Sequence, residues 1–162
     1  MRMSDEPSVS VETVIAADPA DIYDVVSDLD AMASFGTEFQ GGDWVSGRPG
    51  AVGSRFRGRQ QMGERAWETT SVVSVADRGR AFAWEVRNGD DELVATWTFT
   101  LRSVPGGTEV SYGVVVGPGR SGLTARIAEQ PEAEATIIDR RLGMFQENMV
   151  KVLEGVRRRV GG

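Results

Sequence analysis

PEAEATIIDRRLGMFQENMVKVLEGVRRRV, residues 131–160, is the segment from which the rest of this chain can be interpreted. Its apolar residues recur at intervals of three and four, which places them on one stripe of an α-helix. Pro131 suits a first helical turn, and Gly161 follows an arginine-rich last turn. A helix of this length spans about 40 Å and needs a broad apolar surface to lie on. The apolar stripe consists of Ile138, Leu142, Phe145, Met149, Val152, Leu153, Val156 and Val160.

The residues before this helix carry the signals of an antiparallel sheet. Apolar and polar residues alternate in short runs, and glycine-containing turns separate one run from the next. Two short helices are predicted after the first strand, at residues 19–28 and 30–35, because Asp18-Pro19 begins the first and Gly36 ends the second. Strands are predicted at residues 8–17, 43–46, 53–62, 67–76, 81–87, 93–104 and 109–116, and a connector at 117–130 with a helical piece at 123–129.

This order of elements predicts an α+β fold. Successive hairpins form a curved antiparallel sheet of about seven strands, and the long helix covers its concave face. A curved sheet wrapped on one helix seldom closes completely, so we expect a cavity between the two layers. Residues 8–162 are expected to form a single domain, and residues 1–7 a flexible N-terminal tail.

The composition narrows the classes of function. With 40% hydrophobic and 26% charged residues, the chain is typical of globular proteins. It has no apolar run of about 18 residues, and its N-terminal residues lack an apolar signal core, so no membrane insertion and a cytoplasmic location are expected. The net charge of −6 argues against a nucleic-acid partner, because such binding depends on neutralising phosphates.

Cysteine and histidine are both absent from the sequence. Without them the chain has no disulfide, no thiolate nucleophile, no imidazole base and no ordinary zinc ligand set. We therefore expect no metal and no cofactor. Any catalysis would depend on carboxylates, tyrosine, serine or threonine, arginine, the single lysine Lys151 or bound water.

Five segments carry a resemblance to a known superfamily. They are Val11–Asp28 (VETVIAADPADIYDVVSD), Gly53–Arg59 (GSRFRGR), Trp67–Val75 (WETTSVVSV), Gly79–Val86 (GRAFAWEV) and Trp97–Val110 (WTFTLRSVPGGTEV). With these segments the chain resembles the START/Bet v 1-like (SRPBCC) superfamily, specifically its polyketide cyclase/dehydrase and lipid-transport group. The resemblance implies a helix-grip fold and a pocket for a hydrophobic small molecule. It identifies no catalytic residue, because the superfamily has no invariant catalytic set and hosts carriers, receptors and cyclases.

Aromatic side chains on the inward faces of the strands are the candidates for a binding site. Pockets favour aromatic walls with a few polar groups, yet simple packing in the core explains each aromatic residue equally well. Gln60 and Tyr112 would supply polar groups, either to a ligand or to a neighbouring strand. The candidate ligand-binding residues are Phe56, Gln60, Trp67, Phe82, Trp84, Trp97, Phe99, Tyr112, Leu142, Phe145 and Met149.

Residues 117–122, GPGRSG, match the glycine pattern of dinucleotide-binding proteins. That motif requires a second parallel strand after the helix, and nothing after Gly122 predicts a strand, so we interpret the segment as a loop. Within the long helix, Arg141 is predicted to point mostly outward. Gly143 either allows another segment to approach closely or is a tolerated surface glycine.

Three functions fit these observations. The first is a non-enzymatic binder or carrier of a hydrophobic molecule that is lipid, polyketide-like or aromatic. The second is a cyclase, aromatase or dehydratase that positions a polyketide-like substrate and moves protons through Tyr112, a carboxylate or water. The third is an interaction module that forms a homodimer through exposed strand faces, although the arginines at 55, 57 and 59 indicate a solvated face. The sequence favours the first without identifying the ligand.

Overall fold

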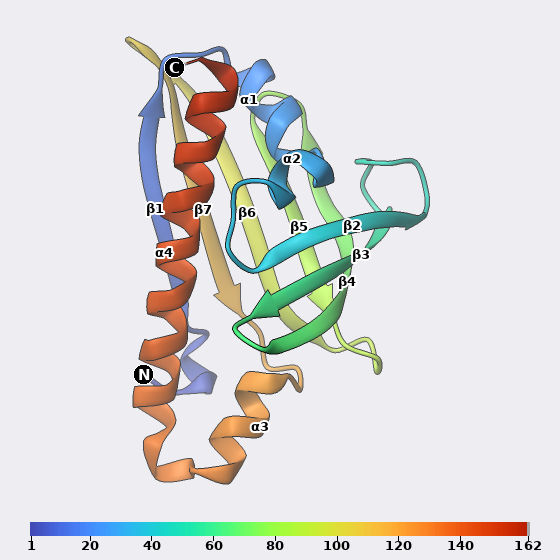
Figure 1. Ribbon diagram of the computed structural model, residues 1–162, viewed down its shortest axis with the longest axis vertical. Helices are drawn as coiled ribbons and strands as arrows, with labels where there is room; N and C mark the ends of the chain where they lie inside the picture. The colour runs from blue at the N-terminus through green and yellow to red at the C-terminus, as the bar shows by residue number, and fades with distance from the viewer. Residues whose placement is uncertain (162) are drawn as a thin grey trace.

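The computed structural model describes residues 1–161 and consists of one curved sheet with helices on its concave side (Figure 1). All seven strands pair antiparallel with their neighbours in the order β1-β7-β6-β5-β4-β3-β2. The α+β, helix-grip prediction is confirmed. The elements are β1 (Ser8–Ile15), α1 (Pro19–Val26), α2 (Leu29–Ala33), β2 (Phe39–Ser46), β3 (Arg55–Met62), β4 (Arg65–Asp77), β5 (Ala81–Arg87), β6 (Leu93–Val104), β7 (Gly107–Val116), α3 (Gly122–Glu129) and α4 (Glu134–Val160).

Helix α4 packs along β1 and β7, at one edge of the sheet. Its apolar stripe is buried, with Ile138, Met149 and Val156 fully enclosed. Arg157 fixes the C-terminal end of the helix to β1, because its Nη2 donates to Thr13 Oγ1 at 2.7 Å and to the Val14 carbonyl at 2.9 Å. Residues 131–133, predicted as the first helical turn, form a separate 3₁₀ turn. None of the helices in the described residues combines the length and apolar character needed to cross a lipid bilayer.

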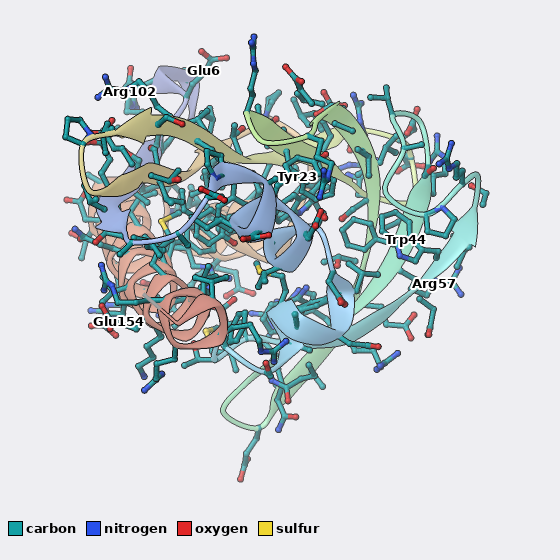
Figure 2. The ribbon with its side chains drawn as sticks, turned by 90° about the horizontal axis from the view of Figure 1, so that it is seen from above. Glu6, Tyr23, Trp44, Arg57, Arg102 and Glu154 are labelled. Carbon is teal, nitrogen blue, oxygen red and sulfur yellow. The ribbon has the colours of Figure 1, made fainter. Side chains whose placement is uncertain are left out.

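The sheet curves from beside α4 to the opposite side of the molecule. Figure 2 looks down on this arrangement, with α4 seen end-on and the strands passing around the interior. Arg57, on the outer face of β3, points into solvent there, and its neighbours Arg55 and Arg59 are exposed as predicted. Because α4 lies near the β1 edge and β2 forms the far edge, the space between them must be filled by side chains or left open.

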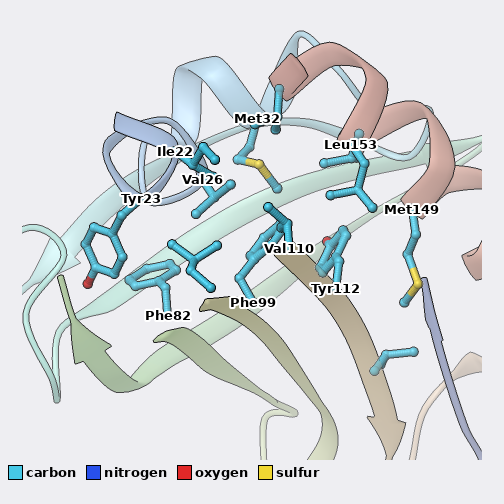
Figure 3. Packing of buried hydrophobic residues seen from close by; sticks show 14 of the residues in the cluster. Ile22, Tyr23, Val26, Met32, Phe82, Phe99, Val110, Tyr112, Met149 and Leu153 are labelled. Carbon is cyan, nitrogen blue, oxygen red and sulfur yellow. The ribbon is translucent and has the colours of Figure 1, made fainter. Parts of the chain in front are cut away.

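The core lies where α1, α2 and α4 meet the middle of the sheet (Figure 3). Phe99 on β6 and Tyr112 on β7 are register partners, and their rings stack with centroids 3.9 Å apart. Tyr23 on α1 meets Phe82 on β5 edge to face at 5.8 Å. Both pairs are typical aromatic contacts: the first packs β6 on β7, and the second holds α1 against β5.

Several elements begin or end one to three residues from the predicted position, and the start of β2 differs most. Strand β2 begins at Phe39, four residues before the predicted residue 43, because the pairing with β3 continues across a register shift at Gly41. Gly41 has a φ of 146°, a conformation that glycine adopts easily. The pair Gly41-Gly42, which suggests a turn in the sequence, therefore lies inside strand β2. Residues 1–7 include a short 3₁₀ turn, and the Met3 N–H donates to Glu134 at 2.8 Å. Flexibility of this segment stays a prediction.

Candidate functional site

A chamber of about 180 Å³ lies between the middle of the sheet and the helices, and we call it the inner chamber. Strands β3 to β7 supply its floor, and α1, α2 and α4 supply its roof. The curvature of the sheet creates this space, since α4 rests on one edge and cannot reach the other. The side chains that close it therefore decide what it holds.

Tryptophan side chains form much of the chamber wall. Trp84 on β5 and Trp97 on β6 are register partners, with ring planes 9° apart and centroids 6.3 Å apart. Phe145 reaches down from α4 and meets the Trp97 ring edge to face at 5.1 Å. Both tryptophans are only half-buried although they face the interior of the fold, because the chamber leaves part of each ring uncovered. These rings are therefore walls of the chamber, whereas Phe99 is enclosed core.

Tyr112 contributes a polar group to this aromatic wall. Every fully enclosed side-chain nitrogen or oxygen among the described residues has a hydrogen-bond partner. The Tyr112 hydroxyl makes no hydrogen bond to another described residue, so it cannot be one of these fully enclosed atoms. Because Tyr112 lines the inner chamber, its hydroxyl borders that chamber. Figure 3 shows this hydroxyl directed from the sheet toward the helices. Burial raises the pKa of Tyr112, and the nearby Glu38 carboxylate raises it further, so the phenol remains protonated at neutral pH.

Further polar atoms come from β3 and β4. The Gln60 amide Nε2 is 3.3 Å from Thr69 Oγ1, across a pair of neighbouring strands. Both residues line the inner chamber, together with the buried Ser71. Gln60 thus satisfies one donor within the sheet and retains its amide oxygen for another partner. A chamber that is mostly aromatic with a few placed polar groups suits a small organic molecule.

An ion pair joins α4 to the segment before β2. Arg141 donates to both carboxylate oxygens of Glu38, at 2.7 and 2.8 Å, and the two side chains are 19% and 13% exposed. The Arg141 guanidinium also lies 4.2 Å from the Phe145 ring centroid, a cation–π contact. About two turns further along α4, Asn148 Oδ1 accepts a hydrogen bond from the Thr37 N–H at 2.8 Å. We call these two contacts the clasp, because they bridge the open side between α4 and β2.

A second chamber of about 490 Å³ adjoins the first, and we call it the outer chamber. It lies between α3, the first half of α4 and the ends of strands β3 to β7. The two chambers are neighbours, because they share wall residues that include Trp67, Phe145 and Arg141. The outer chamber differs in character, because arginines from several elements line it.

Eight of the eleven predicted ligand-binding residues line the inner chamber: Phe56, Gln60, Trp67, Phe82, Trp84, Trp97, Tyr112 and Phe145. The other three do not line it. Phe99 is fully covered beneath Tyr112, and Met149 is fully buried against the core. Leu142 packs half-buried on the edge of the core. A role in binding stays a prediction for the eight residues that line the chamber.

Sequence reasoning misplaced Arg141 and missed Glu38. Arg141 was predicted to point outward, but it points toward Glu38 and lines both chambers. The spacing of four to Phe145 and eight to Met149 puts it on the inward stripe, so the periodicity contained the signal. The prediction followed the general preference of arginine for solvent instead of this spacing. Glu38 had no such signal, because its partner lies 103 residues away in the chain.

The glycine-rich segment at residues 117–122 is a loop, as predicted. The Gly117 and Gly119 N–H groups donate to the carbonyls of Val94 and Leu93, each at 2.8 Å. A Cβ at either glycine would overlap the Leu93 carbonyl, so the glycines allow the loop to approach β6. Helices α3 and α4 follow without a further strand in the described residues, so the segment lacks the architecture of a dinucleotide site.

The comparison with known proteins agrees with this architecture. A family model described as polyketide cyclase / dehydrase and lipid transport matches residues 6–154. The chain belongs to this family. The resemblance carried by the five sequence segments is thereby confirmed. Among curated proteins, none matches the sequence.

Solved structures of similar fold come from bacteria and plants. A polyketide cyclase-like protein of Corynebacterium glutamicum has 24% identity and a TM-score of 0.64, covering 93% of this chain and 89% of that one. The Zhui aromatase/cyclase of a Streptomyces species has 13% identity and a TM-score of 0.72, over 96% and 93%. A ginseng major latex-like protein has 11% identity and a TM-score of 0.67, over 95% and 97%. At these identities the likeness shows the fold alone.

Proposed function

We propose that this family member binds a hydrophobic small molecule with a planar, ring-containing body in the inner chamber. The observation that carries the proposal is the parallel pair Trp84–Trp97, half-buried at the wall of a chamber inside the fold. Flat rings that remain partly uncovered are good stacking surfaces for another ring, and stacked aromatic pairs contribute about 0.5–1.5 kcal/mol beyond the area they bury. Ring systems suit this wall better than a flexible acyl chain, which loses more rotamer freedom on binding.

The polar groups of the chamber would set the orientation of the ligand. A protonated Tyr112 donates a hydrogen bond, so it would recognise a carbonyl or ether oxygen. The Gln60 amide oxygen accepts one, so it would recognise a hydroxyl. A ligand that carries oxygen substituents on a ring body therefore satisfies both, whereas a pure hydrocarbon leaves both without a partner.

The test compares two tryptophans of the same chain. The fluorescent probe N-phenyl-1-naphthylamine is uncharged and planar, and its titration into the purified protein measures affinity for the chamber. Trp97→Ala should weaken binding about tenfold, because it removes a stacking wall. Trp44→Ala is the matched control, because Trp44 packs on Phe56 at 5.2 Å but does not line either chamber. Equal losses in both variants, or no binding by the wild type, would refute the proposal.

The alternative is a cyclase, aromatase or dehydratase acting on a polyketide-like substrate. Tyr112 is the observation that favours it, since its unpaired hydroxyl borders the chamber and stays protonated. A phenol in that state would donate a hydrogen bond to a ketone oxygen while an enol carbon of the same bound chain attacks the carbonyl carbon. The ketone π bond breaks as the new C–C bond forms, and the proton that the enol oxygen loses passes through water to the new alkoxide. Incubation with a synthetic poly-ketone should then give a cyclised product that Tyr112→Phe fails to form. Unchanged product formation by Tyr112→Phe would remove this role.

A further inference from the structure

We propose that the outer chamber binds the anionic group of an amphipathic ligand whose apolar body occupies the inner chamber. This inference rests on the proposed function, since it extends the same bound molecule into the second chamber. The ligand class is then a ring-containing organic anion, with a carboxylate, phosphate or sulfonate at one end. The charge of the outer chamber, its geometry and the wall residues that it shares with the inner chamber support the proposal in turn.

The charge of the outer chamber is opposite to that of the whole chain. Its walls include Arg65, Arg87, Arg120, Arg126, Arg140 and Arg141. Glu68 is the single carboxylate residue among the described wall residues, and it lies 4.0 Å from Arg57 on the outer face of the sheet. A chamber with this composition, in a chain of net charge −6, concentrates positive charge at one place.

Three of these arginines have no carboxylate partner among the described residues. Arg87 pairs with Glu85 at 2.7 Å, Arg120 pairs with Asp90 and Glu92, and Arg141 pairs with Glu38. The three without an ion pair are Arg65, Arg126 and Arg140. A guanidinium whose hydrogen-bond donors are not taken by a carboxylate remains available to an incoming oxyanion, which it binds through two parallel bonds.

These three arginines come from three different elements. Arg65 begins β4, Arg126 lies in α3, and Arg140 lies in α4, yet all three line the same chamber. Arg65 is also positioned by its surroundings. Its Cζ lies 5.5 Å from the Trp67 ring centroid, and a Cβ at Gly122 would overlap its guanidinium. The absence of a side chain at Gly122 therefore leaves room for Arg65 beside the start of α3.

The two chambers are placed to hold one molecule. Trp67 and Phe145 line both, so a ring stacked in the inner chamber would lie against side chains that also form the wall of the outer one. Arg141 also lines both and is already paired with Glu38, which leaves the three unpaired arginines to meet a new charge. A ligand with its polar end in the outer chamber would keep that end hydrated, because Arg65, Arg126 and Arg140 are exposed.

The experiment uses two probes that differ in one group. 8-Anilinonaphthalene-1-sulfonate carries a sulfonate on the naphthalene ring, and N-phenyl-1-naphthylamine lacks it. The wild type should bind the sulfonate probe more tightly, and added salt should reduce that preference because the guanidinium groups are exposed. The triple variant Arg65→Gln, Arg126→Gln and Arg140→Gln should lose about tenfold affinity for the sulfonate probe, since each exposed charge pair contributes modestly and the variant removes three. Its affinity for the neutral probe should not change.

A second triple variant separates local contacts from net charge. Arg48→Gln, Arg55→Gln and Arg59→Gln make the same change of charge at exposed residues that line neither chamber and do not pair with Glu68, the wall carboxylate of the outer chamber. This control should retain the preference for the sulfonate probe. Equal affinity of the wild type for the two probes, or an equal loss in both triple variants, would overturn the outer-chamber proposal while leaving the inner-chamber one intact. Failure of both probes to bind would refute the proposed function itself.

Competition then identifies the kind of anion. Naphthoate and naphthyl phosphate share a ring body and differ in the oxyanion, so displacement of the sulfonate probe by each gives their relative affinities. Displacement of the probe by either anion supports an oxyanion subsite if the triple variant at Arg65, Arg126 and Arg140 no longer shows it. The relative affinities of the two anions then show which oxyanion the subsite prefers. Displacement by uncharged naphthalene methanol with the same affinity as both anions would contradict it.

Discussion

Replacing Glu38 and Arg141 separately and together should show that the clasp stabilises the fold through a mutual interaction. The pair is bidentate at 2.7 and 2.8 Å, and the side chains are 13% and 19% exposed. Removing one member of a buried pair costs about 3–5 kcal/mol, because the other charge remains without a partner. Partial exposure reduces this, so we expect Arg141→Met to lower the free energy of unfolding by about 2–3 kcal/mol.

Glu38→Gln should cost less, about 1–2 kcal/mol, since Arg141 keeps its contacts with Phe145 and Met62 and can reach the hydrated outer chamber. The double variant should be only about 1 kcal/mol less stable than the wild type, because a neutral amide and a thioether replace both charges. The difference from additivity is a coupling energy of about 2–4 kcal/mol. For a chain of this length the single Arg141→Met change lowers Tm by about 5–10 °C.

Urea unfolding followed by tryptophan fluorescence measures all four free energies at neutral pH, and an unchanged m-value shows that the variants share one native state. Asp43 and Arg59 provide the control cycle, because their ion pair of 3.2 Å is 78% and 54% exposed. That exposed pair should give a coupling energy below about 1 kcal/mol. A coupling of less than about 0.5 kcal/mol for Glu38 and Arg141 would refute the reasoning, since the bridge would then add nothing to folding.

Three further outcomes follow from the described contacts. Gly155→Ala should lower stability by about 1–2 kcal/mol net in urea unfolding, because a Cβ there would overlap the Phe35 ring and overpacking outweighs the gain in helix propensity. Gly143→Ala, in the same helix with open space at its Cβ, should raise stability by about 0.5–1 kcal/mol, and equal effects of the two changes would contradict this. Burial raises the pKa of both tyrosines of the chain, Tyr23 and Tyr112, so ultraviolet titration should show less tyrosinate in the folded protein than in the unfolded chain at about pH 10. Stability should accordingly fall as the pH rises above about 10, because the unfolded state releases protons that the folded state keeps, and a tyrosine that titrates normally in the folded protein would exclude this.

Local patterns were sufficient to predict most of the fold. Strands β5 and β6 begin and end at the predicted residues, because strict alternation stops at recognisable turns on both sides. The stripe of α4 was equally clear, since its spacing repeats over the whole helix. The start of β2 was missed because Gly41 and Gly42 resemble a turn, and only the pairing with β3 shows that the strand passes through them.

The site was predicted less completely, for a physical reason. Strand alternation shows which aromatic residues face inward, but it does not show which of them a neighbour covers. Trp97 and Phe99 lie on the same face of β6, yet Trp97 borders the chamber and Phe99 is enclosed. The arginines of the outer chamber could not be predicted from the sequence for the same reason. Arg126 of α3 and Arg65 line the same chamber only once the chain is folded.

Helix α4 links the two proposals, because it forms part of both chambers along its length. Asn148 lines only the inner chamber, Phe145 and Arg141 line both, and Arg140 lines only the outer one, so positive charge appears on the wall within about 12 Å of helix. A rigid molecule with one acidic substituent matches that change directly. A long flexible acid could also place its charge beside the arginines, but it would have to order each rotatable bond to lie in the inner chamber, at a cost of about 0.5–1.5 kcal/mol for each group immobilised. We therefore expect the proposed site to prefer short, rigid anions, so the order of affinity among acids of equal charge should follow rigidity more closely than total apolar area.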